Sequence, residues 1–367
     1  MPRLPDAGDR RFLVGPGDDA AVFIARPGMA AWAITTDMLV EGVHFDLRWT
    51  SAEDLGWKAL AVNLSDLAAM GDVRPALGVV AAGLPPSLPV GFVDGFYRGL
   101  GKLARRYGFS LAGGDTVRSD RLVVSLAVLG ELPKGRRPLT RAGARPGDEL
   151  MVTGTLGDAA AGLEILKAFQ VNRGSESRVG RDFKKASLPF VRGGLGRGRD
   201  SASSEKALPP PHPLLTKEGG MNFGTVSNSE RFLVHRLLRP EPRVELAAKI
   251  ACVPGVTAMI DSSDGLWRSS LILAGASHVG VRIETERLPL SPALVRWASR
   301  GKRDARELAL AGGEDYELVL TARPAAARRL ASRGWAKALG RVVAGGGVRA
   351  VTEGRTRSVP HEFEHFR

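Results

Sequence analysis

The chain has 367 residues, of which 44% are hydrophobic, and a formal net charge of +13. This length suffices for about two domains with a large core, which excludes a small peptide-like protein or a wholly disordered one. A single cysteine, Cys252, excludes an intrachain disulfide, and neither a long apolar run nor an apolar N-terminal segment occurs, so we expect a cytoplasmic protein with no membrane partner.

One atypical segment supplies +5 of the net charge. Residues 171–229 contain ten Lys and Arg against five Asp and Glu, and the remaining excess is scattered along helix-like patterns. Neither zinc-ligand spacing nor a basic aromatic platform accompanies it, so we expect no nucleic-acid partner. Cys252 has no metal-ligand neighbour in the sequence and is interpreted as a small buried hydrophobic residue.

The first part of the chain alternates strand-like and helix-like patterns, which indicates an α/β or α+β unit. One helix is predicted to begin with a capping box of Ser51 and Asp54, and another to end at Gly108. The predicted strands are 30–40, 76–84, 109–117 and 121–132, and the predicted helices are 51–71 and 90–108.

A second unit is predicted from about residue 139 to the C-terminus, after an N-terminal domain of residues 1–138. It begins with a strand at 150–153 and a helix from Asp158, and later segments read as helical at 229–250 and strand-like at 257–276 and 280–288. The tail at 335–359 resembles a strand pair with a glycine turn. Residues 171–229 lack periodicity and are rich in Gly, Pro, Ser and charge, so we predict a disordered insertion there.

Several aspartates follow apolar runs beside small residues or glycine. They are Asp18, Asp19, Asp37, Asp66, Asp115, Asp261 and Asp264. Each alone is explained by an ordinary Asx turn or helix cap. Together, carboxylates that point to one interior place would repel one another unless cations neutralise them, and Mg²⁺ is the ion that prefers such oxygen ligands.

Asp66 makes the case most clearly. Val62 lies one turn before it and Met70 one turn after it, so its carboxylate shares a helical face with apolar side chains. A magnesium ion would offset its charge. The alternative is an aspartate bonded to a helix N-terminus or to an arginine.

Known phosphate-binding and catalytic motifs are absent. The segment around Lys102 lacks the glycine and hydroxyl residues of a P-loop, and the GPGDDA segment is followed by a strand where the dinucleotide motif requires a helix. Six histidines without paired spacing argue against catalytic zinc, although His44 could touch substrate or be structural. The AGGDT segment could offer backbone N–H donors to phosphate.

Eight motifs in order resemble the thiamine-monophosphate kinase family of the aminoimidazole-ribonucleotide-synthetase-like superfamily. They are GDDAAVF, TTDMLVEGVHF, KALAVNLSDLAAMG, GGDT, LTRAGARPGD, VTGTLGDAAAGL, DSSDGL and GGEDYEL. The resemblance implies a two-domain α/β fold and transfer of phosphate from ATP to thiamine monophosphate, the last step of thiamine diphosphate synthesis. It also implies a homodimer whose N-terminal strands pair into a shared barrel.

The same resemblance assigns residues by motif. Asp66, Asp115, Arg141 and Asp264 match catalytic positions, and His44, Glu314 and Phe363 match substrate contacts. Nucleotide contacts are implied at Tyr107, Gly114, Asp115, Arg141 and Ser263. Ligands for several Mg²⁺ ions are implied at Asp19, Thr35, Thr36, Asp37, Asp66, Asp115, Asp261 and Asp264.

Direct in-line transfer fits this residue set, because a phosphate oxygen is already a nucleophile and needs no strong base. The segment 171–229 is foreign to the family pattern, and the N-terminus is short. Selenophosphate synthetase would need a reactive cysteine near the N-terminus, and aminoimidazole ribonucleotide synthetase should lack NLSDLAAMG together with GGEDYEL. A catalytically silent nucleic-acid-binding relative would show steeply salt-dependent binding and no ATP turnover.

Overall fold

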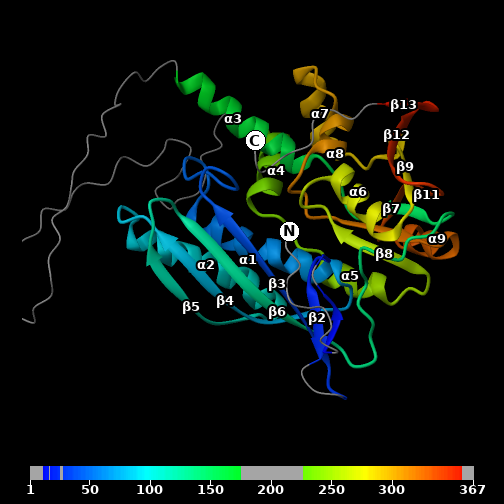
Figure 1. Cartoon of the computed structure of the whole chain (residues 1–367). Coiled ribbons are helices and arrows are strands. Elements are labelled where there is room, and N and C mark those ends of the chain that lie inside the picture. The colour runs from blue at the N-terminus through cyan, green and yellow to red at the C-terminus, as the bar shows by residue number, and fades with distance from the viewer. Residues whose placement is uncertain (1–10, 16, 25–27, 175–225, 358–367) are drawn as a thin grey trace, which may run out of the picture.

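The computed structural model describes residues 11–15, 17–24, 28–174 and 226–357, with the backbone alone for 170–174. Two mixed sheets, each accompanied by helices, make up these residues (Figure 1). The predicted mixed α/β class is therefore confirmed. No helix within the described ranges has the length and apolar character that a membrane crossing requires.

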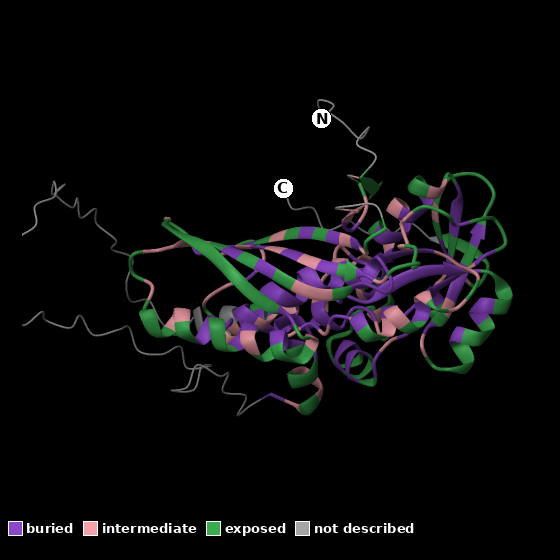
Figure 2. Ribbon diagram, turned by 90° about the horizontal axis from the view of Figure 1, so that it is seen from below, coloured by how far each residue is buried: buried purple, intermediate pink, exposed green. Residues whose placement is uncertain are grey.

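The first sheet has the strand order β1-β2-β3-β6-β4-β5, and only β4 and β5 are parallel neighbours. Its strands are β1 (Phe12–Val14), β2 (Ala21–Ile24), β3 (Ala31–Val40), β4 (Arg74–Leu84), β5 (Ser110–Arg118) and β6 (Val123–Leu132). Helices α1 (Ala52–Ala69) and α2 (Val90–Tyr107) lie on one face of this sheet, and the other face is largely exposed (Figure 2).

Two of the predicted helix signals of this part, the N-cap at Ser51 and the stop at Gly108, are confirmed, whereas the Asp54 carboxylate accepts from the Ser51 hydroxyl and does not complete the predicted capping box. Ser51 caps α1 by accepting from the Asp54 N–H, and Gly108 ends α2 with a φ of 65°. The two helices touch through backbone: a Cβ at Gly56 would lie 1.9 Å from the Phe96 carbonyl oxygen. Glycine is therefore required at that crossing.

The second sheet has the strand order β13-β12-β9-β11-β7-β10-β8. Its strands are β7 (Glu149–Val152), β8 (Val256–Asp261), β9 (Gly280–Glu284), β10 (Leu318–Ala322), β11 (Lys337–Val343), β12 (Gly347–Thr352) and β13 (Arg355–Arg357). The helices of this part are α3 (Asp158–Gly174), α4 (Asn228–Leu238), α5 (Val244–Ala251), α6 (Leu266–Ser277), η1 (Thr285–Arg287), α7 (Pro292–Gly301), α8 (Ala305–Ala311) and α9 (Pro324–Ser332).

Four predictions for this part are wrong. The second half of 257–276 is helix α6, and the tail strands β11 and β12 are separated by β9 rather than paired. Cys252 is exposed, with its sulfur 3.2 Å from an Arg136 guanidinium nitrogen. Helical structure enters both ends of the predicted insertion, since α3 runs to Gly174 and α4 begins at Asn228 with Ser227 as its cap. The rest of the insertion, 175–225, lies outside the described residues.

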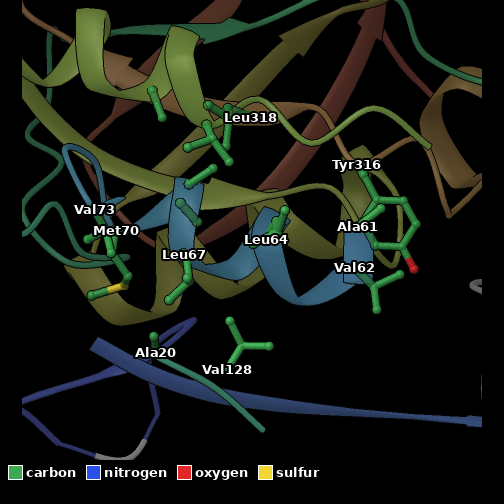
Figure 3. Close-up of a cluster of buried hydrophobic side chains, with 14 of the residues drawn as sticks. Ala20, Ala61, Val62, Leu64, Leu67, Met70, Val73, Val128, Tyr316 and Leu318 are labelled. Atoms are coloured by element: carbon green, nitrogen blue, oxygen red, sulfur yellow. The ribbon is translucent and has the colours of Figure 1, made fainter. Parts of the chain in front are cut away.

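Helix α1 lies between the two sheets. It packs on β3 and β6 on one side and on β8 on the other. Figure 3 shows Leu64 and Leu67 of α1 in one buried cluster with Val128 of β6 and with Tyr316 and Leu318 near the start of β10. The core is thus continuous across the connection between Leu132 and Glu149, where the predicted domain boundary at 138/139 falls.

Candidate functional site

An acidic cavity of about 650 Å³ opens where the first sheet, α1 and the end of β8 meet. We call it the acid cavity. It is lined by Asp18, Asp19, Ala20, Ala21, Ile34, Thr35, Thr36, Asp37, Asp66, Ala127, Arg141, Asp261 and Ser263. The structure therefore brings together most of the predicted metal ligands, although they come from segments far apart in the chain.

Three carboxylates form the centre of the acid cavity. One oxygen from each of Asp19, Asp66 and Asp261 lies within 4.8 Å of the other two. Asp19 precedes β2, Asp66 lies on α1, and Asp261 is the last residue of β8. A cluster this tight suits a hard divalent cation with oxygen ligands.

The protein neutralises these carboxylates only in part. The Thr35 hydroxyl donates to Asp66 at 2.6 Å, the Ser65 hydroxyl donates to Asp261 at 2.8 Å, and Arg141 contacts Asp19 at 2.7 Å. Within the described residues, three buried polar atoms here have no hydrogen-bond partner: Asp19 Oδ2, Arg141 Nε and Ser262 Oγ. Buried polar atoms are normally paired, so these atoms mark a place for a ligand.

The electrostatics agree with this geometry. Burial, and then the nearby Asp261, raise the pKa of Asp19 to about 7 despite Arg141. Burial and the charge of Asp264 raise the pKa of Asp37 to about 6. Burial is also the main cause that raises the pKa of Asp261 to about 6 and that of Asp66 well above its usual value. Without a bound cation, the protein therefore destabilises the charged form of these carboxylates.

This donor set fits Mg²⁺. The acids are close together and buried, one of their oxygens has no partner, and Arg141 approaches only Asp19 among them. The alternative explanation for Asp66, a helix N-terminus or an arginine, is not what the structure shows, since the Asp66 carboxylate accepts its hydrogen bond from the Thr35 hydroxyl.

The predicted site residues Thr36, Asp37, Asp264 and Ser263 also lie at this cavity or beside it. The Asp37 backbone N–H donates to Asn63 Oδ1 at 3.0 Å, which ties β3 to α1. Asp264 is near enough to Asp37 to raise its pKa, and also lies 3.5 Å from Arg268. The Thr36 hydroxyl lies 3.4 Å from that of Ser125, and Ser263 donates to Asp261 at 3.3 Å.

Three of the predicted nucleotide contacts do not line the acid cavity. Gly114 and Asp115 lie on β5, the exposed edge strand, separated from β3 by β4 and β6. Asp115 accepts from the Thr116 N–H at 2.8 Å, and a Cβ at Gly114 would lie 2.0 Å from the Val80 carbonyl oxygen. The Tyr107 hydroxyl donates to the Pro242 carbonyl at 3.0 Å, on the outer side of α2. Phe363 lies outside the described residues.

A second cavity, of about 470 Å³, lies near the N-terminal end of α1. We call it the α1–α3 pocket. Its walls are mostly apolar and include residues 42–46, Trp49, Leu163, Leu237, Leu238 and Leu308, together with His44, Lys58, Glu164, Lys167 and Glu314. The two predicted substrate contacts His44 and Glu314 are therefore in one cavity.

Polar groups in this pocket are held in place. The Val40 backbone N–H donates to His44 Nδ1 at 3.1 Å, so Nε2 carries the proton of the neutral ring. Lys58 donates to both oxygens of Glu314, at 3.0 and 2.9 Å. Arg48 forms a bidentate pair with Asp46, and Glu164 lies 2.7 Å from Arg303.

Lys58 was missed in the sequence. Asp18 was recognised there only as one of the aspartates beside glycine, and in the structure its carboxylate accepts from the Arg141 backbone N–H at 3.1 Å. Lys58 stands eight residues before Asp66, with Val62 between them, and so shares their helical face. A charged residue two turns before Asp66 on that face was the signal that could have revealed it.

Helix α1 connects the two cavities. Lys58 faces the α1–α3 pocket and Asp66 faces the acid cavity, and eight helical residues rise about 12 Å. A molecule with an organic part in the pocket could therefore direct a charged end toward the acids.

The N-terminal part of the chain matches a known family model. Residues 17–132 match the N-terminal domain of AIR synthase related proteins. This range contains the first sheet with α1 and α2, and it ends where β6 ends.

Whole-chain comparisons extend the match. A thiamine-monophosphate kinase of Bacillus subtilis is 34% identical over 309 residues, which cover 84% of this chain and 77% of the relative. A solved structure of AaThiL complexed with AMPPCP and TMP has a TM-score of 0.71 at 30% identity, covering 94% of this chain and 90% of that one. The thiamine-monophosphate kinase of Stenotrophomonas maltophilia has a TM-score of 0.69 at 32% identity, covering 95% and 93%. The chain belongs to the thiamine-monophosphate kinase family.

Proposed function

We propose that this chain transfers the γ-phosphate of ATP to thiamine monophosphate and forms thiamine diphosphate. The observation that carries the proposal is the placement of an acid cluster and a mostly apolar pocket along one helix, α1. A related structure is complexed with AMPPCP, an analogue of ATP, and with TMP.

Two anions must approach each other in this reaction, and their repulsion is the main obstacle. Arg141, half-buried beside Asp19, supplies one fixed positive charge at the acid cavity. The residues that would hold Mg²⁺ are Asp19, Asp37, Asp66 and Asp261, with Asp264 and the hydroxyls of Thr35 and Thr36 beside them. Bound Mg²⁺ would neutralise phosphate charge and orient the reacting oxygens.

The chain's own residues then position the acceptor. In this proposal the α1–α3 pocket takes its rings, with Glu314 as a hydrogen-bond acceptor and His44 Nε2–H as a donor. The acceptor's phosphate oxygen attacks the γ-phosphorus directly, ADP leaves, and no covalent enzyme intermediate forms.

The first sheet also supports a homodimer. Its outer face exposes large apolar side chains that helices do not cover, among the described residues: Ile34, Met38, Leu77, Val79, Leu111 and Val117. Exposed apolar patches of this kind commonly mark protein interfaces. A dimer through this face would cover β5 and place Gly114 and Asp115 at the interface. Val79→Asp should then shift the molar mass in sedimentation from dimer to monomer, whereas an unchanged mass would reject this face.

The decisive experiment measures ADP release with thiamine monophosphate or with unphosphorylated thiamine, each with and without Mg²⁺. Turnover only with the monophosphate and Mg²⁺ is expected, since the acceptor oxygen belongs to a phosphate. ATP turnover that depends on another acceptor would move the chain elsewhere in the superfamily.

A further inference from the structure

Lys58 is a buried lysine of α1 that contacts both sides of the α1–α3 pocket. Its side chain is only 3% exposed, and its ammonium donates to Glu314 Oε1 at 3.0 Å, to Glu314 Oε2 at 2.9 Å and to the His44 carbonyl at 3.1 Å. The three N–H donors of the ammonium thus have three acceptors. The Lys58 Nζ therefore joins two walls of the pocket, one at Glu314, 256 residues from Lys58 in the sequence, and one at His44, 14 residues from it.

The Glu314 wall needs such a fixation. Glu314 and Tyr316 have φ values of 67° and 51°, in the left-handed region that side chains other than glycine rarely adopt. Their backbone N–H groups donate to Ser263 and Ser262, at 2.6 and 3.2 Å. These two serines directly follow Asp261, so the strained segment is also attached to the end of the acid cavity.

Asp315 and Glu317, the neighbours of Tyr316 in the sequence, belong to a buried network of hydrogen bonds and ion pairs. Asp315 accepts from the N–H groups of Gly157 and Ala159 at the start of α3. Glu317 contacts both Arg236 and Arg243. These contacts fix the backbone of residues 314–317. The Glu314 carboxylate, which is 25% exposed, is oriented by Lys58.

The His44 wall depends on the same ammonium. His44 belongs to the turn after β3, where Gly42 donates to the Phe45 carbonyl at 2.8 Å. The ring of His44 is fixed by the Val40 N–H, and its backbone carbonyl is fixed by Lys58. One side chain therefore joins the Glu314 carboxylate to the His44 turn across the pocket.

We propose that Lys58 is a positioning residue that preorganises the α1–α3 pocket for the organic part of the phosphate acceptor. This inference rests on the proposed function and adds a specific role to it. Lys58 acts through Glu314 and the His44 turn and has no contact with the transferred phosphate. Because the pocket binds a part of the acceptor that does not react, loss of Lys58 affects ground-state and transition-state binding alike.

The test is Lys58→Met, which keeps the length of the side chain and removes its charge. We expect KM for thiamine monophosphate to rise about tenfold or more, with kcat changed less than about threefold and KM for ATP less than about twofold. Calorimetric titration of the protein with thiamine monophosphate, in the absence of ATP so that no reaction occurs, should show the same loss of affinity. Thermal melting of each variant shows whether it is folded.

The matched control is Lys102→Met. Lys102 also pairs with a carboxylate, that of Glu53, but on the exposed surface of α2, where its side chain is 48% exposed. Its kinetic constants should equal those of the unsubstituted chain. An effect of Lys102→Met as large as that of Lys58→Met would overturn the proposal.

A double-variant cycle separates positioning from direct contact. Because Lys58 acts through Glu314 and the His44 turn, Lys58→Met added to Glu314→Gln should raise KM by clearly less than Lys58→Met does in the unsubstituted chain. Independent, multiplicative losses would overturn the proposal, because Lys58 would then act on the acceptor by itself. Equal increases in both KM values would also overturn it, since they indicate general damage. Failure of the proposed function is distinct: the unsubstituted chain would not turn over thiamine monophosphate at all.

Discussion

The acid cavity and the α1–α3 pocket lie along the same helix but treat charge in opposite ways. In the pocket, Asp46, Glu164 and Glu314 each have a basic partner, whereas the cavity gathers Asp19, Asp66 and Asp261 with Arg141 on Asp19. Paired charges stabilise a fixed shape in the absence of ligand, and clustered acids favour a bound cation. The pocket is therefore preformed, while the cavity depends on what it binds.

The largest expected effect comes from removing one acid of the cavity. Asp66→Asn should lower kcat by at least about a hundredfold, comparable to loss of a preorganised electrostatic contact in other enzymes. Asp66 is one of the three acids at the centre, and an amide cannot supply the same charge to a cation. The measurement is steady-state ADP release at saturating ATP and acceptor.

Asp94→Asn is the control for this change, because Asp94 lies on the exposed side of α2. It should retain activity within about twofold, as surface substitutions usually have small effects. Near-normal activity of Asp66→Asn would remove the proposed role of the acid cavity.

The sequence predicts the acids of the acid cavity better than the ion pairs of the α1–α3 pocket. Asp19, Asp37, Asp66 and Asp261 could be found because each follows an apolar run, so local pattern alone shows an acid entering the core. The position of Lys58 on the face of Asp66 could have been noticed, but its role could not be assigned, since its partner Glu314 is 256 residues away in the sequence. Asp115 shares the local pattern, but the strand order puts it on an edge strand.

The same limit explains the errors in the fold. Helix α6 buries Leu266, Ser269, Ser270, Leu273 and Ala274, which is a helical spacing, but two serines conceal the hydrophobic period and no side chain caps its first turn. Strands β11 and β12 follow a glycine turn as a hairpin would, yet β9 inserts between them. Cys252 is exposed because it caps the end of α5 at the surface, a position that residue type alone does not indicate.

Substitution of Arg236, a buried residue of α4 next to the pocket residue Leu237, should affect the stability of the fold more than the rate of the reaction. Arg236→Met should lower the free energy of unfolding by about 3 kcal/mol, as breaking buried ion pairs does. The Arg236 guanidinium donates to Glu317 at 2.9 Å and to the Asp315 carbonyl at 3.2 Å, and both acceptors would lose a donor. Equilibrium unfolding in urea measures the change.

Arg98→Met serves as the comparison for Arg236→Met. Arg98 pairs with Glu53 at 3.3 Å on the surface, with 61% of its side chain exposed. Such exposed pairs contribute roughly 0–1 kcal/mol. Equal losses from the two substitutions would contradict the view that paired, buried charges fix the pocket.

Metal removal should show the opposite behaviour at the acid cavity. The folded-state pKa values of about 7, 6 and 6 for Asp19, Asp37 and Asp261 lie above the ordinary aspartate value of 3.8. Between about pH 4 and pH 7 the folded chain therefore binds more protons than the unfolded chain, and these groups make the free energy of unfolding fall as pH rises. Bound Mg²⁺ should offset this fall.

We therefore expect saturating Mg²⁺, compared with EDTA, to stabilise the fold by about 2 kcal/mol at pH 8. At pH 5.5 the gain should be much smaller, because protons compete with the metal for the same carboxylates. The measured quantity is the difference in melting temperature between Mg²⁺ and EDTA at each pH, in which other titrating groups cancel. An equal difference at both pH values would mean that Mg²⁺ binds elsewhere.

The smallest effect is expected from the segment between the two helices of the pocket wall. Helices α3 and α4 pack against each other and both contribute to the α1–α3 pocket, whereas neither lines the acid cavity. Replacing residues 175–225 by a linker of about ten Gly and Ser residues should leave activity within about threefold, a barrier change under about 1 kcal/mol. The shorter connection reduces the entropy cost of closing the loop by roughly 1.5 kcal/mol, so melting should not fall.

The kinetic constant that changes in this linker variant shows whether the α1–α3 pocket or the acid cavity is affected. A modest rise in KM for thiamine monophosphate, with unchanged dependence on Mg²⁺, would locate the effect at the pocket, where α3 and α4 lie. A changed Mg²⁺ dependence would mean that the two cavities respond together, which α1 makes possible because it carries both Lys58 and Asp66. A hundredfold loss of activity would show that the segment has a role of its own, since neither loop closure nor the packing of α3 on α4 accounts for a change of about 2.7 kcal/mol.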